Sequence, residues 1–238
     1  MTICLITRTQ PGAQVTQAVL ASLGYQPIVV PAANIVATGA TVATEGVQAL
    51  LMTSAAAARS VQLTAHLAAL PVYAVGDATA DAATHAGFTN VISAGGDGAT
   101  LAVLAADRMK TDAGALLHLR GQEVAGDVTG MLSACGFETR NIEVYHTYDH
   151  PDFRNDIRLH LSGHSGLVIV HSPAGARRLY DAIVDLKLDL KDWEVVGLSP
   201  ACLTPVHDIG FAQLISAAQP DESALIEAIS LHATHSRT

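Results

Sequence analysis

Two serines stand where apolar, strand-forming runs give way to helical patterns, and both could serve chemistry. The segments are ALLMTSAAAARSV, residues 49–61, and VIVHSPAGARRLY, residues 168–180. Ser54 and Ser172 are placed to cap a helix, and the proline after Ser172 is typical of a first helical position. The free backbone N–H groups and positive dipole of such a helix end also suit a carboxylate or a phosphate. Capping alone explains either serine, so an anion-binding role depends on what else lies nearby.

Other polar residues follow other apolar runs in the same way. Ligands of open α/β sheets bind beyond the carboxyl ends of the strands, so residues that follow strands are expected to meet. Arg8 and Arg120 stand at equivalent places and would add bidentate donors for an anion. The candidate binding residues are therefore Arg8, Thr53, Ser54, Thr79, Arg120, Gly121, Ser172 and Ser199.

Motifs for other chemistries are missing from the chain. The sequence contains no GxxxxGK[ST], GxGxxG, GxSxG or HExxH,. In the segment HTYDH, residues 146–150, an extended backbone would place His146, Tyr148 and His150 on one face,. Without further ligands this segment does not make a metal site, so we predict no metal.

Composition and charge restrict the class of protein. Of the 238 residues, 50% are hydrophobic and 15% charged, which indicates a folded chain with a sizeable core,. The net charge of −9 argues against a nucleic-acid or anionic-membrane partner, because phosphate binding needs a basic face,. The three cysteines form no CxxC, and Cys4 and Cys135 are expected to be small buried hydrophobes,. With no signal peptide or membrane-spanning run either, we expect a cytoplasmic protein.

Short runs rich in Val, Ile and Leu alternate with helical patterns along the whole chain. Most runs are apolar throughout, which is typical of parallel strands that are covered on both faces. Strand–helix alternation of this kind predicts an α/β fold. Strands are expected near residues 3–7, 27–30, 49–53, 72–75, 90–93, 116–119, 140–148, 167–171, 194–198 and 213–216.

The order of the elements repeats within the chain. Residues 5–25 match residues 117–137, with Arg8 on Arg120. Further along, LLMTSAAAAR matches VIVHSPAGAR, YAVGDATADAATHAGF matches EVVGLSPACLTPVHDIGF, and VISA matches LISA. Four landmarks in the same order indicate a duplicated five-strand unit and therefore two domains.

Two divisions of the chain fit this repeat. A linear cut would give two halves. Alternatively, the chain crosses between domains at two equivalent extended stretches, which makes residues 1–33 plus 151–238 one domain and residues 38–144 the other. Residues 34–37 and 145–150 would then pair as a two-stranded linker. The repeat by itself does not choose between the two divisions.

Taken together, these segments resemble the uroporphyrinogen-III synthase family. The resemblance covers nearly the whole chain and rests on the order and spacing of LITRTQPGA, LLMTSAAAA, VYAVGDATADAATHAGF, LLHLRGQ, EVYHTYD, VIVHSPAGA and VVGLSPACL. It implies two doubly wound, flavodoxin-like α/β domains joined by a two-stranded linker, which favours the interrupted division.

The resemblance also implies a reaction. Linear hydroxymethylbilane loses water, its terminal pyrrole ring is inverted, and the macrocycle closes to uroporphyrinogen III without a metal or organic cofactor. Tyr145 is the candidate catalytic residue, as a hydrogen-bond donor to the leaving hydroxyl; packing between domains is its alternative role. In the family a glycine is usually followed by a Thr-rich turn, whereas GLSPACL has Ser199 and Pro200 there, and a proline removes one backbone donor,.

Partners follow from the same resemblance. We expect a monomer that binds hydroxymethylbilane and makes transient contact with the preceding enzyme, hydroxymethylbilane synthase. The alternative function is a non-enzymatic two-domain binding protein or sensor, which would bind a small anionic ligand with the same residues but without turnover.

Overall fold

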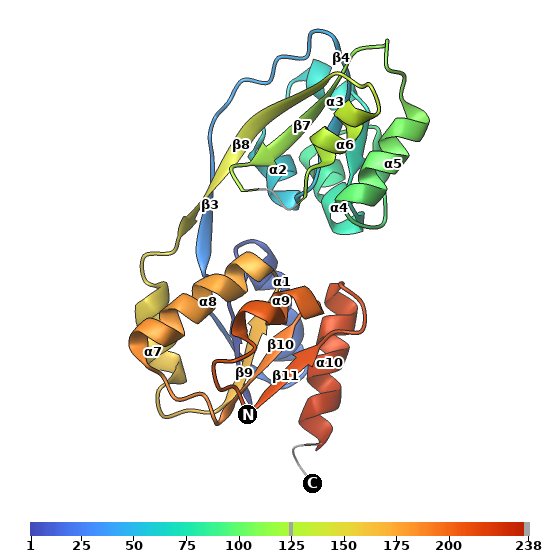
Figure 1. Ribbon diagram of the computed structural model, residues 1–238. Coiled ribbons are helices and arrows are strands. Elements are labelled where there is room, and N and C mark those ends of the chain that lie inside the picture. Colours follow the sequence, from blue (N-terminus) through green and yellow to red (C-terminus); the bar gives the residue numbers. More distant parts are fainter. Residues whose placement is uncertain (124–125, 236–238) are drawn as a thin grey trace. The chain divides into compact units, whose positions relative to one another are not determined.

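The chain forms two compact units in this computed structural model, which describes residues 1–123 and 126–235. Unit 1 comprises Met1–Asn34 and Tyr148–Thr238, and unit 2 comprises Ile35–Thr147 (Figure 1). Unit 1 is therefore discontinuous in sequence, with the whole of unit 2 inserted between its two segments.

Unit 1 is built on a five-stranded parallel sheet. Its strands are β1 (Ile3–Ile6), β2 (Gln26–Val29), β9 (Gly166–Val170), β10 (Trp193–Gly197) and β11 (Gln213–Ser216), in the order β11-β10-β9-β1-β2. This is the doubly wound order of flavodoxin-like sheets. The helices are α1 (Gly12–Ser22), α7 (Phe153–Leu161), α8 (Pro173–Leu186), α9 (Pro200–Leu203) and α10 (Glu222–His235), with a 3-10 turn at Thr204–Val206.

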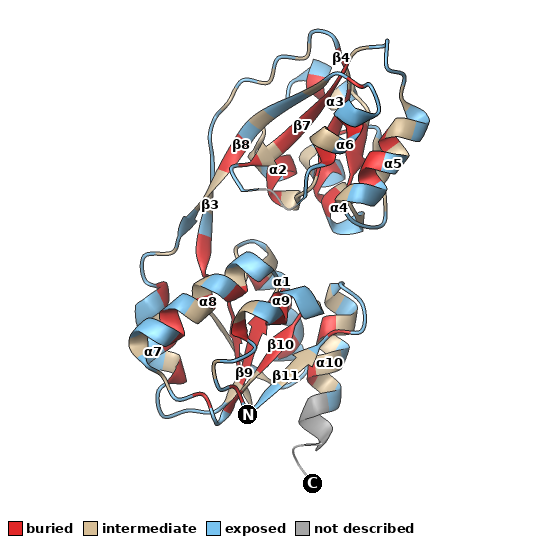
Figure 2. Ribbon diagram, in the orientation of Figure 1, coloured by how far each residue is buried: buried red, intermediate tan, exposed pale blue. Residues whose placement is uncertain are grey.

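The apolar strands of unit 1 serve two cores, one on each face of the sheet. Val168 and Val170 pack with α7, α8 and α9, whereas Leu167 and Ile169 pack with α1 and α10. Figure 2 shows β9 and β10 as buried strands beneath helices whose outer faces are exposed. Burial on both faces explains why these strands carry apolar residues continuously.

Unit 2 has the same layered architecture. Its strands are β3 (Ala33–Ala37), β4 (Val47–Met52), β5 (Val72–Ala74), β6 (Val91–Ser93), β7 (Ala115–Gly121) and β8 (Thr139–Asp149), in the order β3-β8-β7-β4-β5-β6. The helices are α2 (Ala55–Ser60), α3 (Ala65–Ala69), α4 (Asp77–Ala86), α5 (Gly98–Arg108) and α6 (Val128–Ala134). Leu50 and Met52 pack with α2 and α4, and Leu51 packs with α5 and α6 on the opposite face.

The two strands that carry the chain between the units are neighbours in the sheet. The N–H group of His150 donates to the carbonyl of Ala32, and the N–H group of Thr38 donates to the carbonyl of Val144. From the first bond to the second, the residue number rises in β3 and falls in β8, so the two strands pair antiparallel. The predicted fold class, two doubly wound parallel-sheet units with a two-stranded linker, is confirmed.

Each unit contains parts of both sequence repeats. The matched segments place β1 with β7, β9 with β4, β10 with β5 and β11 with β6. With these correspondences the two sheets have the same spatial order. Because β1, from the first repeat, pairs with β9, from the second, the structural unit is not the sequence repeat.

One expectation about the core is wrong. Cys4 is buried, but Cys135 is exposed at the end of α6. Helix α6 buries Val128 and Leu132, but Cys135 is its C-cap residue and lies outside the buried face. Cys202 is buried in α9.

Candidate functional site

The predicted serines cap helices in both units. Ser54 accepts a hydrogen bond from the Ala56 N–H group at 3.1 Å, at the start of α2. Ser172 accepts one from the Gly175 N–H group at 3.0 Å, at the start of α8. Capping is therefore a role that both hydroxyls fulfil, and each lies where a parallel strand ends.

Thr53 contacts a buried histidine, His118, that was not among the residues predicted from the sequence. Thr53 Oγ1 lies 3.0 Å from Nε2 of His118, which is 3% exposed in the middle of β7. Burial and the charge of Arg120 lower the pKa of His118 from 6.5 to about 4, although a hydrogen bond with Asn141 opposes this. The imidazole is thus neutral at pH 7. A polar residue inside the apolar run LLHLR was the signal that could have identified it.

Tyr145 and Gly121 form one packed arrangement at the end of β7. The two residues are register partners, next to a register shift between Arg120 and Gly121. A β-carbon on Gly121 would lie 2.5 Å from Cε2 and 2.8 Å from the hydroxyl oxygen of Tyr145. Tyr145 is 8% exposed and belongs to the core that β4, α2 and α4 share. The glycine therefore provides the space in which the tyrosine ring lies.

Arg120 extends along the same strand end. Its Nε donates to the carbonyl of Gly121 at 2.9 Å, and its Nη2 donates to the carbonyl of Gln122 at 2.9 Å. Nη2 also lies 3.4 Å from Glu143, a long and partly exposed ion pair. The structure thus brings Arg120, Gly121 and Tyr145 together. Thr79 is buried within the first turns of α4 and is not part of this group.

Ser199 and Pro200, where the sequence departs from the family pattern, lie at the start of α9 in unit 1. Pro200 is the first residue of α9, and Ser199 precedes it without capping the helix through its side chain. Instead Ser199 Oγ lies 3.4 Å from the sulfur of Cys202. The proline supplies no N–H group at this helix end, as its chemistry requires.

Arg8 makes a strong contact that the sequence did not reveal. It follows β1, and its Nη1 donates to Oε2 of Glu222 at 2.7 Å. Thr16, which is fully buried in α1, donates to the other carboxylate oxygen of Glu222. Burial would raise the pKa of Glu222, but the contact with His171, the hydrogen bond from Thr16 and the charge of Arg8 lower it to about 2.

His171 is the second residue that sequence analysis missed. It lies between β9 and the cap Ser172, its side chain is 7% exposed, and its Nε2 is 3.4 Å from Glu222 Oε2. Within the described part of the chain, neither buried ring nitrogen has a hydrogen-bond partner, so the approach to Glu222 is an electrostatic contact. Burial lowers the pKa of His171, although the nearby carboxylate of Glu222 opposes this.

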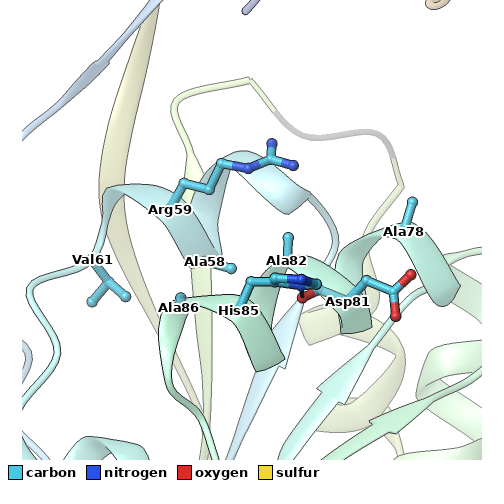
Figure 3. A pocket seen from close by; sticks show the side chains of 8 residues that line it. All are labelled: Ala58, Arg59, Val61, Ala78, Asp81, Ala82, His85 and Ala86. Carbon is cyan, nitrogen blue, oxygen red and sulfur yellow. Dashed lines mark hydrogen bonds between the residues drawn. The ribbon is translucent and has the colours of Figure 1, made fainter. Parts of the chain in front are cut away.

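Two open cavities are lined by residues other than the predicted ones. A groove of about 580 Å³ runs between α2 and α4 of unit 2, and Figure 3 shows Arg59, Asp81 and His85 along it. A cavity of about 220 Å³ in unit 1 is lined by Asp149, Arg178 and neighbouring residues.

Residues 1–123 and 126–235 contain no group of three His, Cys, Asp or Glu side chains arranged to hold a metal ion. Nor do they include a helix both long and apolar enough to cross a membrane.

The fold and these residues define a two-unit α/β protein with hydroxyls, arginines and helix N-termini at the ends of its parallel strands. A family model described as "Uroporphyrinogen-III synthase HemD" matches residues 14–227 of the chain. The chain therefore belongs to the uroporphyrinogen-III synthase family, whose members are lyases of porphyrin and haem biosynthesis.

Two solved structures with a similar fold come from Helicobacter pylori and Thermus thermophilus. Uroporphyrinogen-III synthetase from Helicobacter pylori superposes with a TM-score of 0.65 at 15% identity, over 97% of this chain and 100% of that one. A mutant uroporphyrinogen-III synthase from Thermus thermophilus gives a TM-score of 0.60 at 12% identity, over 100% of both chains. No curated protein sequence matches the chain significantly. At these identities the structures support the fold, and the family model supports the family.

Proposed function

We propose that this chain converts hydroxymethylbilane into uroporphyrinogen III, and the family match over residues 14–227 carries this function. The hydroxyl group of the linear tetrapyrrole leaves as water, the terminal pyrrole ring is inverted and the macrocycle closes. Spontaneous closure gives the symmetric type I isomer. The enzyme must therefore hold the substrate so that attack by the substituted ring carbon is favoured.

The proposed role of Tyr145 is hydrogen-bond donation to the leaving hydroxyl. When the C–O bond breaks, electrons from the pyrrole nitrogen form an azafulvene cation, and the departing oxygen takes up a proton to become water. A phenol hydroxyl can assist this departure as a general acid. The close fit of the ring against Gly121 supports the proposal, because a held ring positions its hydroxyl precisely,.

The remaining site residues are proposed to bind the acetate and propionate groups of the substrate. Hydroxyls and helix ends suit carboxylates, and arginines bind them with two parallel hydrogen bonds. This assignment applies to Arg8, Thr53, Ser54, Thr79, Arg120, Gly121, Ser172 and Ser199. Local donors of this kind can bind a polyanion although the protein has a net charge of −9,.

We further propose a monomeric, cytoplasmic enzyme that receives its unstable substrate through transient contact with hydroxymethylbilane synthase. Its domains would be residues 1–33 plus 151–238 and residues 38–144. Cys4, Cys135 and Cys202 are all free thiols, which agrees with a reducing compartment,.

A product-isomer assay tests the function directly. Hydroxymethylbilane is generated in situ, the protein is added, and the products are oxidised and separated into uroporphyrin isomers I and III. We expect type III in proportion to the amount of protein. Type I alone from folded protein would reject the synthase and favour the binding protein or sensor.

A further inference from the structure

Three elements of unit 1 meet at the carboxylate of Glu222. Arg8 follows β1, Thr16 lies in α1, and Glu222 is the first residue of α10. Arg8 Nη1 donates to Oε2 at 2.7 Å and Thr16 donates to Oε1, so both carboxylate oxygens are engaged. The fold thus fixes this glutamate at the edge of the sheet where Arg8 lies.

We propose that Glu222 is a positioning residue that holds the Arg8 guanidinium in place to bind a carboxylate group of the substrate. The proposal rests on the proposed function, because that function supplies the anionic substrate. Glu222 itself does not touch the substrate; it acts through Arg8.

Arg8 retains donors for a second anion. Its hydrogen bond to Glu222 is the one side-chain bond that it makes within residues 1–123 and 126–235. A guanidinium has five N–H donors in a planar fork, so several remain for a further acceptor. The Arg8 side chain is 34% exposed, which leaves it accessible from solution.

The backbone leaves space for this arrangement at Gly12. A β-carbon on Gly12 would lie 2.6 Å from Cζ of Arg8 and closer still to Nε. Gly12 is the first residue of α1. The guanidinium therefore lies against the start of this helix, and a side chain at position 12 would displace it.

Arg8 is the permanently charged group that faces the carboxylate of Glu222, at 2.7 Å. His171 Nε2 also lies 3.4 Å from Oε2, but burial lowers the pKa of His171, which disfavours a charged ring although the carboxylate of Glu222 opposes this. Against the opposing effect of burial, the contacts with His171, Thr16 and Arg8 lower the pKa of Glu222 to about 2, so its carboxylate is ionised near neutral pH. One positive and one negative charge thus face each other, and each restricts the rotamers of the other.

The test is a set of variants measured for KM, kcat and the type III fraction. Glu222→Ala removes the acceptor, and Glu222→Gln keeps one acceptor oxygen without the charge. Arg8→Ala and Arg8→Ala/Glu222→Ala complete a double-mutant cycle. Gly12→Ala displaces Arg8 without touching Glu222, and alanine is a better helix former, so folding is preserved. Glu227→Ala, at an exposed position on the same helix, is the matched control.

The expected pattern is a loss of substrate binding that depends on Arg8. Arg8→Ala, Glu222→Ala and Gly12→Ala should each raise KM about tenfold with little change in kcat, as loss of a charged hydrogen bond predicts. Glu222→Gln should stay within about threefold of the unaltered chain, since the amide oxygen still accepts from Arg8. Glu222→Ala should add nothing in the Arg8→Ala background, and Glu227→Ala should match the unaltered chain. Asp221 still caps α10 through the Ala224 N–H group, so Glu222→Ala retains a formed helix.

Three outcomes would overturn the proposal. A lower KM in Glu222→Ala would mean that the glutamate competes with substrate for Arg8. Additive effects in the cycle would mean that it acts elsewhere. A fall in kcat at constant KM would place it in the chemical step.

Failure of the proposed function is recognised separately. If the unaltered protein makes type I isomer alone, the same variants are tested for binding of uroporphyrin III, a stable compound with the same acidic side chains. Weaker binding in Arg8→Ala and Glu222→Ala, with rescue in Glu222→Gln, would support the positioning role without turnover. Equal binding by all variants would reject it.

Discussion

The ring of Tyr145 occupies the space that a side chain on Gly121 would need. Their closeness follows from the shift in register between β7 and β8, which places Gly121 opposite Tyr145. A larger residue at position 121 would push the ring out of the core that it shares with α2 and α4. The position of the candidate catalytic hydroxyl therefore depends on the absence of one methyl group.

Replacing Gly121 with alanine should reduce both stability and activity. Overpacking of this kind costs about 1–3 kcal/mol, and the displaced hydroxyl should lower kcat. Urea unfolding and the isomer assay measure the two effects. In a Tyr145→Ala background the added methyl group has no ring to meet, so the stability cost should disappear. Persistence of the full cost there would mean that the backbone, not the ring, is disturbed.

Replacing Tyr145 with phenylalanine should affect turnover more than binding. The ring still packs on Gly121, but the hydroxyl that would assist departure of water is gone. General-acid assistance is worth about 10²–10⁴ in rate, so kcat should fall toward the lower end of this range. Single-turnover kinetics and uroporphyrin III binding separate the two effects. Equal losses in both would assign the tyrosine to binding.

Stability should fall as the pH is lowered from 6.5 to 4, because of His118. The fold lowers the pKa of His118 from 6.5 to about 4, so it favours the neutral ring. Above pH 6.5 the ring is neutral in both states and this stability is fully present. Below it the unfolded chain takes up the proton first, and the loss reaches roughly 3 kcal/mol at most near pH 4. His171 changes stability in the same direction.

Urea unfolding at pH 7 and pH 4.5 measures this loss. His118→Gln keeps a hydrogen-bonding group near Thr53 but does not titrate, so the variant should lose less stability between the two pH values. His66→Gln, at an exposed position on α3, is the control and should behave like the unaltered chain. An unchanged pH dependence in His118→Gln would assign the acid loss to other groups.

Ser172 allows capping to be separated from substrate binding. Ser172→Ala should destabilise the protein by about 1 kcal/mol, because Gly175 loses its acceptor,. Ser172→Asn should restore stability, since asparagine caps equally well. Recovery of stability but not of KM in Ser172→Asn would support substrate contact. Recovery of both would leave capping as the role of the serine.

The fold class could be predicted because the strands are covered on both faces. Val168, Ile169 and Val170 are all buried, and alternate residues face different cores. Such a run is recognisable from its apolar residues alone. The hydroxyls at the strand ends were found for the same reason, since capping is a local preference that Ser54 and Ser172 express within a few residues.

The contacts of the charged residues could not be predicted in this way. Arg8 and Glu222 are 214 positions apart, and neither has a local partner that marks the pair. His118 was within reach, because a histidine inside an apolar run needs a partner such as Thr53,. His171 was not identified because its charged neighbour, Glu222, comes from α10, a helix far along the chain that only the fold brings close to it.

The sequence by itself determined the α/β class, the repeat and the helix caps, because apolar periodicity and capping act over a few residues. Tertiary structure decided which repeat supplies which strand, as when β1 pairs with β9 across most of the chain. It also decided that Tyr145 packs on Gly121 and that Arg8 binds Glu222. These contacts depend on strand pairing and helix packing between distant segments, and a short stretch of sequence does not determine them.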